Sequence, residues 1–165
     1  MARAFLGLGS NSGDRLKFLR EAVTELSAVS DISVVSISGV YETEPFGVRE
    51  QRDFLNAVAV IECDLGPAKF AGTLGQIERR VGRKAAERWG PREIDIDLLY
   101  FGGEVLKTPT LTLPHPGVAK RRFVLVPLAE LAPDFRDPET GITVSEMLAR
   151  CPDSGRVKKT SMNLR

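Results

Sequence analysis

The sequence predicts an α+β domain, because segments of strand character alternate with two segments of helical spacing in the order βαββαβ. Residues 3–8 are apolar and stop at a turn-forming stretch, after which apolar residues recur at helical spacing from Leu16 to Leu26. The β-branched residues 32–40 predict the second strand, and residues 54–62 predict the third. This order is typical of the ferredoxin-like arrangement, in which a sheet that contains antiparallel strands carries both helices on one face.

The next part of the chain predicts a helix, a basic segment and a final strand. Gly66-Pro67 opens the helix, and apolar residues follow at helical spacing at Phe70, Leu74, Ile77 and Val81. Residues 94–101 alternate as a strand, and the Gly102-Gly103 turn predicts a hairpin with residues 104–107. Residues 41–53 are rich in turn formers and charges, and they predict a loop long enough to be functional.

The C-terminal part predicts an extension of short helices. Residues 114–131 contain Pro127, which predicts one or two short helices because proline interrupts a helix interior. Thr143 and Glu146 have the spacing of a capping box and start a short helix at residues 143–150. Neither a repeat nor a linker divides the chain, so residues 1–165 are expected to form one domain with one core.

The composition excludes several classes of function. Lys and Arg number 23 against 22 Asp and Glu, so the net charge of +1 gives no general attraction for nucleic acid or an anionic membrane. Cys63 and Cys151 lie far apart without zinc-type spacing, so neither a zinc site nor a disulfide is expected. The apolar stretches are too short for a signal peptide or a membrane helix. These observations predict a cytoplasmic protein without a nucleic-acid or membrane partner.

Asp95 and Asp97 are the strongest functional signal. Residues i and i+2 of a strand point to the same face, so the two carboxylates converge while the isoleucines around them point to the other face. Like charges this close repel each other unless a divalent cation or solvent compensates. Magnesium suits such oxygen ligands, because it takes its remaining ligands from water and substrate phosphates. The spacing alone leaves a solvated carboxylate pair as the alternative.

A basic segment directly precedes this strand and favours a polyphosphate ligand. It contains Arg79, Arg80, Arg83, Lys84, Arg88 and Arg92. Arginine binds phosphate oxygens in a bidentate manner, although cations at a helix C-terminus also complement the helix dipole. Trp89 lies among these residues, in a loop that either folds over a ligand or anchors itself on the sheet.

Three further side chains have a residue type suited to binding. Phe54 and Asn56 share one strand face, so a planar heterocycle could stack on the ring while the amide reads its edge. His115 lies between two prolines, where we expect it to be exposed enough to meet an anion; a surface histidine is also often incidental.

The glycine-rich residues 7–14 do not match a dinucleotide-binding fingerprint, because the glycines run GxGxxxG and no acidic strand end follows. Ser10, Asn11 and Ser12 are instead expected to serve as turn and N-cap residues for a helix that begins near Asp14.

The segment RWGPREIDIDLLYFG resembles the signature of the 6-hydroxymethyl-7,8-dihydropterin pyrophosphokinase family of the folate pathway. The blocks LGLGSNSGD, YETEPFG, DFLNAV and LTLPHP, followed by Arg121 and Phe123, are similar to that family's blocks and stand in its order. The resemblance implies a single pyrophosphokinase domain that transfers pyrophosphate from ATP to the hydroxymethyl group of the pterin and releases AMP. It also implies two Mg²⁺ ions and these two small molecules as partners. We expect a monomer.

The resemblance implies a role for each matching position. Asp95 and Asp97 match the metal ligands, and Arg83 and Arg92 match the catalytic arginines. The positions that match pterin contacts are Thr43, Pro45, Phe46, Phe54, Asn56, Trp89, Asp95 and Phe123. The positions that match ATP contacts are Glu78, Arg83, Trp89, Arg92, Leu98, Thr112, His115 and Arg121.

The chain departs from this family at a few positions. Some members carry tyrosine in place of Phe54 or Pro116. The stretch between Arg83 and Trp89 is one residue shorter than in those members, so Lys84 is the candidate substitute for a second loop arginine.

Two other functions fit parts of the pattern. An RNA-binding module can share the βαββαβ topology, but it presents aromatics and cations on its central strands, where this chain has aspartates that repel phosphate. A nucleotidyl transferase or cyclase also uses paired strand aspartates. Analysis of the reaction products distinguishes these enzymes.

Overall fold

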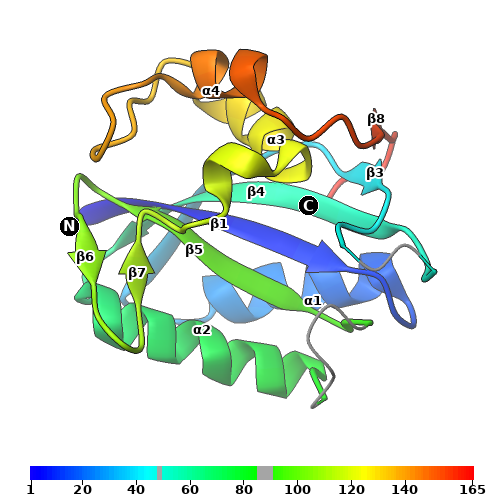
Figure 1. Ribbon diagram of the computed structural model, residues 1–165. Coiled ribbons are helices and arrows are strands. Elements are labelled where there is room, and N and C mark those ends of the chain that lie inside the picture. The colour runs from blue at the N-terminus through cyan, green and yellow to red at the C-terminus, as the bar shows by residue number, and fades with distance from the viewer. Residues whose placement is uncertain (48–49, 85–90) are drawn as a thin grey trace.

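The structure, a computed structural model, describes residues 1–47, 50–84 and 91–165 (Figure 1). In chain order the elements of these ranges are β1 (Ala2–Ser10), α1 (Arg15–Ser27), β2 (Ile32–Ile37), β3 (Tyr41–Thr43), β4 (Phe54–Cys63), α2 (Pro67–Val81), β5 (Asp95–Phe101), β6 (Leu106–Lys107), β7 (Thr112–Leu113), the 3₁₀ turn η1 (Val118–Lys120), α3 (Arg122–Leu131), α4 (Val144–Arg150) and β8 (Val157–Lys159).

One antiparallel sheet organises the fold. Its strands follow the order β5-β1-β4-β3-β8, and β2 pairs with β4 beside β3. The helices α1 and α2 cover one face of this sheet, whereas α3 and α4 lie over the other (Figure 1). The α+β class and the ferredoxin-like order of β5, β1, β4 and β2 are therefore confirmed, with both crossover helices on one face.

Two hydrophobic clusters replace the single core that composition suggested, because helices cover both faces of the sheet. The larger cluster fills the space between the sheet and the pair α1 and α2. The smaller one lies under α3 and α4. Strand β1 shows the division: Leu6 and Leu8 enter the larger cluster, and Phe5 enters the smaller.

The sheet face under α3 and α4 is apolar at one end of its strands and polar at the other. At one end Phe5, Val58 and Leu99 are buried in the smaller cluster. At the other end the same face carries Gly9 of β1 and Asp95 of β5, which line a cavity. The helices α3 and α4 therefore cover only part of this face, and the uncovered part is polar.

The second predicted strand is shorter than expected, and a further short strand follows it. Residues 32–40 contain β2 and then a break, after which β3 lies within the segment predicted as a loop. Both strands pair with β4. At the break the Ser38 N–H donates to the Val58 carbonyl, while the Ser38 Oγ accepts from the Val58 N–H. These bonds keep the interrupted strand attached to the sheet.

The predicted hairpin after Gly102-Gly103 is wrong. Strand β6 pairs with β7 and not with β5. The outer edge of β5 already has other partners, because the Ile96 N–H donates to Glu78 and the Leu99 carbonyl accepts from the His115 N–H. Those bonds leave no place for residues 104–107 beside β5.

Pro127 does not end a helix, which corrects the expectation for residues 114–131. This stretch does contain two short helical elements, η1 and α3, but their boundary is Arg121 and Pro127 lies inside α3. Burial of Val124, Leu125 and Leu128 in the smaller cluster compensates for the hydrogen bond that proline cannot donate. The Thr143 cap of α4 is present, since its Oγ1 accepts from the Glu146 N–H.

Glu130 of α3 connects three parts of the fold. Its carboxylate accepts hydrogen bonds from the Tyr41 hydroxyl at 2.5 Å and from the Gly39 N–H at 3.0 Å, and it pairs with Lys159 of β8 at 3.2 Å. Burial acts to raise the pKa of Glu130, but these hydrogen bonds and the Lys159 charge leave it below the usual value.

We expect Glu130→Gln to destabilise the protein by about 1–2 kcal/mol at pH 7 and by much less at pH 3. A depressed folded-state pKa stabilises the protein above the unfolded pKa, near 4.5, and this contribution is lost as pH falls through the folded pKa. Denaturant unfolding at both pH values measures the difference. The matched control is Glu139→Gln, which removes an exposed pair with Lys107 and should change little at either pH. A Glu130→Gln effect that is equal at both pH values would contradict this account.

No helix in the described part of the chain is both long enough and apolar enough to span a membrane.

Candidate active site

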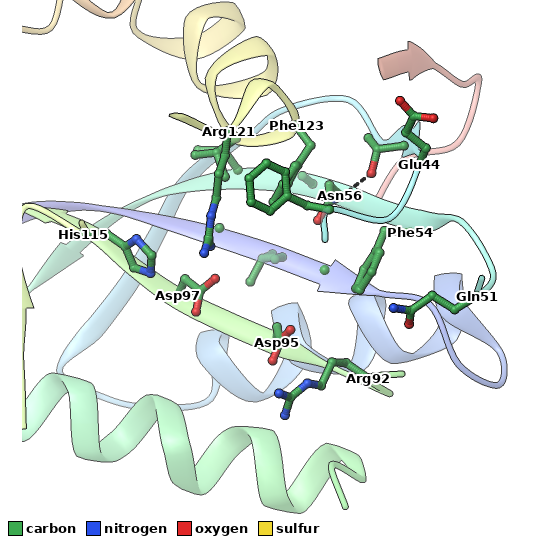
Figure 2. Close-up of a pocket in the computed structure, with 18 of the residues that line it drawn as sticks. Glu44, Gln51, Phe54, Asn56, Arg92, Asp95, Asp97, His115, Arg121 and Phe123 are labelled. Carbon is green, nitrogen blue, oxygen red and sulfur yellow. Dashed lines mark hydrogen bonds between the residues drawn. The ribbon is translucent and has the colours of Figure 1, made fainter. Parts of the chain in front are cut away.

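A cavity of about 340 Å³ occupies the uncovered part of the sheet face (Figure 2). Strands β1, β4 and β5 form its floor, and α3 and the segment after β3 contribute its walls. Its lining includes the carboxylates of β5, three arginines and three phenylalanines, namely Asp95, Asp97, Arg83, Arg92, Arg121, Phe46, Phe54 and Phe123. The sheet thus brings together residues from widely separated parts of the sequence.

Asp95 and Asp97 both point into the cavity, as the strand period predicts (Figure 2). Burial raises the pKa of each carboxyl, and for Asp95 the neighbouring Asp97 charge raises it further. Arg83 contacts Asp95 at 3.4 Å. The Asp97 carboxylate has no hydrogen-bond or ion-pair partner among the side chains and backbone groups that the structure describes. The described side chains therefore compensate only part of the negative charge of this carboxylate pair.

This donor set fits a magnesium ion. Residues 1–47, 50–84 and 91–165 contain no group of three or more metal-ligating side chains that could enclose an ion. Two carboxylates that face a cavity leave most positions of an octahedral ion to water and to substrate oxygens, which is the usual magnesium arrangement beside phosphates.

Glu78 of α2 supports Arg83 and the edge of β5. Its Oε2 accepts from Arg83 Nη1 at 2.9 Å and from the Ile96 N–H at 2.8 Å. The residue is only 9% exposed, and burial raises the pKa of its carboxyl. Glu78 therefore holds Arg83 beside Asp95 without lining this main cavity itself.

Asn11 anchors the backbone of Arg92, a role that the N-cap interpretation missed. The Asn11 Oδ1 accepts from the Arg92 N–H at 2.7 Å, and the Asn11 N–H donates to the Arg92 carbonyl at 2.9 Å. Its Nδ2 donates to Gln51 Oε1 and to the Arg52 carbonyl. The actual N-cap of α1 is Asp14, so Asn11 is free of that task and instead joins three loops around the cavity.

Aromatic rings and one amide side chain form the other side of the cavity. Phe54 and Asn56 project from β4, and Phe123 lies at the start of α3 with its ring 6.0 Å from that of Phe46 (Figure 2). The Asn56 Nδ2 donates to Thr43 Oγ1 at 2.7 Å, which fixes the orientation of the amide. Rings and a fixed amide suit a flat, hydrogen-bonding heterocycle.

Gly9 of β1 lies between the Asp95 carboxylate and the Asn56 amide. Asp95 lies opposite Gly9, and Gly9 lies opposite Asn56 on the next strand, so the carboxylate and the amide share one row across the sheet. A Cβ at Gly9 would lie 2.6 Å from Asn56 Oδ1. Glycine is therefore required for the observed position of the amide.

We expect Gly9→Ala to weaken binding of a heterocyclic ligand by about tenfold or more, because the new methyl displaces the Asn56 amide. Calorimetric titration with a pterin measures this affinity. Gly7→Ala is the comparison variant, since its Cβ would lie at an ordinary 3.6 Å from Leu99 and would leave Asn56 in place. Equal losses in both variants would argue against this role of Gly9.

A second cavity of about 370 Å³ adjoins the first and shares Asp97 and His115 with it. It contains several positions expected to contact ATP: Glu78, Leu98, Thr112 and His115. The departure at Pro116 also lies on its wall. The two cavities together offer room for a ligand that extends past the aspartates.

His115 is partly buried, not as exposed as its sequence context predicted. Burial, with the Arg121 charge, lowers its pKa to about 4, so the ring is neutral at pH 7. Its Nδ1 accepts from the Gly117 N–H at 3.0 Å, which places the proton of the neutral ring on Nε2. His115 can therefore donate one hydrogen bond to a ligand that reaches both cavities.

Some predicted site residues lie elsewhere or outside the described ranges. Trp89 belongs to residues 85–90, which are not described. Pro45 borders a small separate cavity with Phe46 and Phe123. Lys84 donates its backbone N–H to Glu93, and it is not among the described residues that line the main cavity.

The carboxylate pair, the three arginines and the recess for a flat ring fit a phosphoryl-transfer type of enzyme. The sequence model of the 7,8-dihydro-6-hydroxymethylpterin-pyrophosphokinase (HPPK) family matches residues 5–133. The chain belongs to this family.

Two relatives illustrate the similarity. A Methylorubrum extorquens protein named 2-amino-4-hydroxy-6-hydroxymethyldihydropteridine pyrophosphokinase is 46% identical over 155 residues, covering 94% of this chain and 97% of that protein. A protein of the same name from Haemophilus influenzae is 37% identical over 158 residues, covering 96% of this chain and 98% of its own length.

Solved structures share the fold at low identity. Plasmodium falciparum HPPK-DHPS, wild type with SDX-DHP, matches with a TM-score of 0.70 and 14% identity, covering 91% of this chain and 43% of that one. The chain thus spans less than half the length of that protein, and the likeness concerns the fold alone.

Proposed function

We propose that the protein transfers a pyrophosphate group from ATP to the hydroxymethyl group of 6-hydroxymethyl-7,8-dihydropterin and releases AMP, a step of folate biosynthesis. The observation that supports this most is the row Asp95, Gly9 and Asn56, because it places a candidate metal ligand directly across one glycine from a candidate ring-reading amide. The relatives carry the name of this pyrophosphokinase.

The aromatic and amide side chains on one side of the cavity suit the pterin, and the arginines and aspartates on the other side suit ATP. Phe54 and Phe123 border a recess for the pterin ring, and the Asn56 amide, held by Thr43, can read its edge. Arg83, Arg92 and Arg121 lie toward the aspartates, where phosphate oxygens would gather. The second cavity, with Leu98 and Thr112, then has room for the nucleoside part of ATP.

The reaction is an in-line displacement at the β-phosphorus of ATP. The pterin hydroxymethyl oxygen loses its proton to solvent water and forms a bond to this phosphorus. The bond to the oxygen that bridges the α-phosphorus breaks, so that this oxygen leaves with AMP. Asp95 and Asp97 would hold Mg²⁺ ions, two in our proposal, which when bound neutralise phosphate charge and acidify the hydroxyl. Arg83 and Arg92 bring fixed positive charge to the transferring group, and Asn11 and Glu78 hold these arginines in place.

Product analysis tests the proposal. The protein is incubated with Mg-ATP and 6-hydroxymethyl-7,8-dihydropterin, and we expect AMP and the pterin diphosphate in equal amounts. ADP as the product would indicate γ-phosphate transfer, and inorganic pyrophosphate would indicate the nucleotidyl transferase alternative. Either of these products, or turnover that does not depend on the pterin, would reject the proposed reaction.

We also propose that the protein is a monomer formed by one domain and acts in the cytoplasm. These properties remain predictions. Sedimentation equilibrium with and without both substrates tests the monomeric state.

A further inference from the structure

The segment from Asp153 to Lys159 contacts both sides of the aromatic recess. It follows α4, and it lies beyond residues 5–133, the part of the chain that matches the family's sequence model. Figure 1 shows β8 beside β3 at the edge of the sheet, close to the start of α3. This short segment therefore touches elements that are distant from it in sequence.

On one side the segment holds the residues that follow β3. Strand β8 pairs with β3, and Val157 lies opposite Thr43. The Glu44 N–H then donates to the Arg156 carbonyl at 3.3 Å, and the Arg156 N–H donates to Glu44 Oε1 at 3.0 Å. These bonds fix the backbone between Thr43, which orients Asn56, and Phe46, which lines the cavity.

Arg156 also reaches the residue before β4. Its Nη2 donates to Asp53 Oδ2 at 2.5 Å, and Asp53 directly precedes Phe54. The backbone and the side chain of Arg156 therefore connect two parts of the cavity wall, one at Glu44 and one at Asp53.

On the other side Asp153 caps α3. Its Oδ2 accepts from the Arg122 N–H at 3.1 Å, and its Oδ1 accepts from the Gly155 N–H at 2.8 Å. The local N-cap residue, Arg121, makes no side-chain cap hydrogen bond, so Asp153 supplies the cap from outside the helix. The capped turn carries Arg121 and Phe123, which both line the cavity.

Gly155 keeps these two attachments close together. A Cβ at Gly155 would lie 3.0 Å from Asp153 Oδ1 and 3.1 Å from Glu44 Oε1, both tighter than ordinary contacts. The segment thus approaches both carboxylates with its backbone.

We infer that Asp153 and Arg156 are positioning residues that set the distance between the two walls of the pterin recess without touching the pterin. The inference rests on the proposed function. One wall is the stretch from Thr43 to Phe46 with the start of β4, and the other is the first turn of α3. Removal of either residue should loosen the recess and leave the aspartates and the second cavity unchanged, because neither residue lines them.

The test compares the KM values of the two substrates in Asp153→Ala and Arg156→Ala. We expect the pterin KM to rise about tenfold in each variant. The ATP KM should stay within about twofold in Arg156→Ala, and in Asp153→Ala it should rise less than the pterin KM, because the turn that Asp153 caps also carries Arg121. Asp153→Asn and Arg156→Lys, which keep part of the hydrogen bonding, should fall between wild type and the alanine variants. If the alanine variants fail to fold, these two conservative variants carry the same comparison.

The control is Arg150→Ala, which removes an exposed pair with Glu146 within α4 and should leave both KM values unchanged. An unchanged pterin KM, or a parallel rise of both KM values with a lower Tm, would overturn the inference. The wild-type assay separates the two questions: absence of AMP there rejects the proposed reaction, whereas normal wild-type turnover with unaltered variants rejects only the positioning role.

Discussion

Asp97→Asn is expected to lower kcat by about 10³-fold or more at saturating substrates and magnesium. Asparagine keeps the shape of the side chain, but it removes the negative charge that a divalent cation requires at this place. Asp95→Asn should have a similar effect because both carboxylates face the same cavity. The double variant should be little worse than either single one, since residues that act as a unit have non-additive effects.

Steady-state kinetics with a magnesium titration measures this effect. Asp64→Asn is the matched control, because Asp64 is exposed and pairs only loosely with the N-terminal amine at 3.8 Å. Its kcat should stay within about twofold of wild type. Near-normal turnover of Asp97→Asn at saturating magnesium would show that the metal assignment is wrong.

Arg83→Ala is expected to lower kcat by about 10²- to 10³-fold and also to destabilise the fold. The rate falls because a fixed positive charge beside Asp95 is lost. The stability falls by about 2–3 kcal/mol because Glu78, whose side chain is only 11% exposed, loses its ionic partner.

A second substitution separates these two effects. In Arg83→Ala/Glu78→Gln the buried group is neutral and its side-chain oxygen can still accept from the Ile96 N–H, so the unfolding free energy should recover while kcat stays low. Recovery of kcat together with stability would mean that Arg83 acts only through the fold.

Much of the fold and of the candidate site could be predicted because it depends on local periodicity. The period of two along a strand places Asp95 with Asp97, and Phe54 with Asn56, and the structure turns all four side chains toward one cavity. What this period cannot supply is the register between strands. Gly9, which lies between Asp95 and Asn56, acquires its importance only from that register.

The features that were missed depend on tertiary contacts. Strand β8 is a three-residue strand, too short for a periodic signal, and it exists because β3 offers an edge. Asn11 has the residue type of an N-cap, but Asp14 takes that position, and only the folded chain brings Arg92 to the Asn11 amide. The predicted hairpin failed for a similar reason, since Glu78 and His115 occupy the edge of β5.

The late position of β8 in the chain has a consequence for synthesis. Arg83, Asp95 and Asp97 have all been made when the chain reaches the end of β5, and by then most of the larger core is also present. Strand β8 is made after all the helices and strands that line the cavity. A chain that emerges from the ribosome can therefore assemble its phosphate-binding half first. Only when β8 has emerged does it gain the support that shapes the pterin recess.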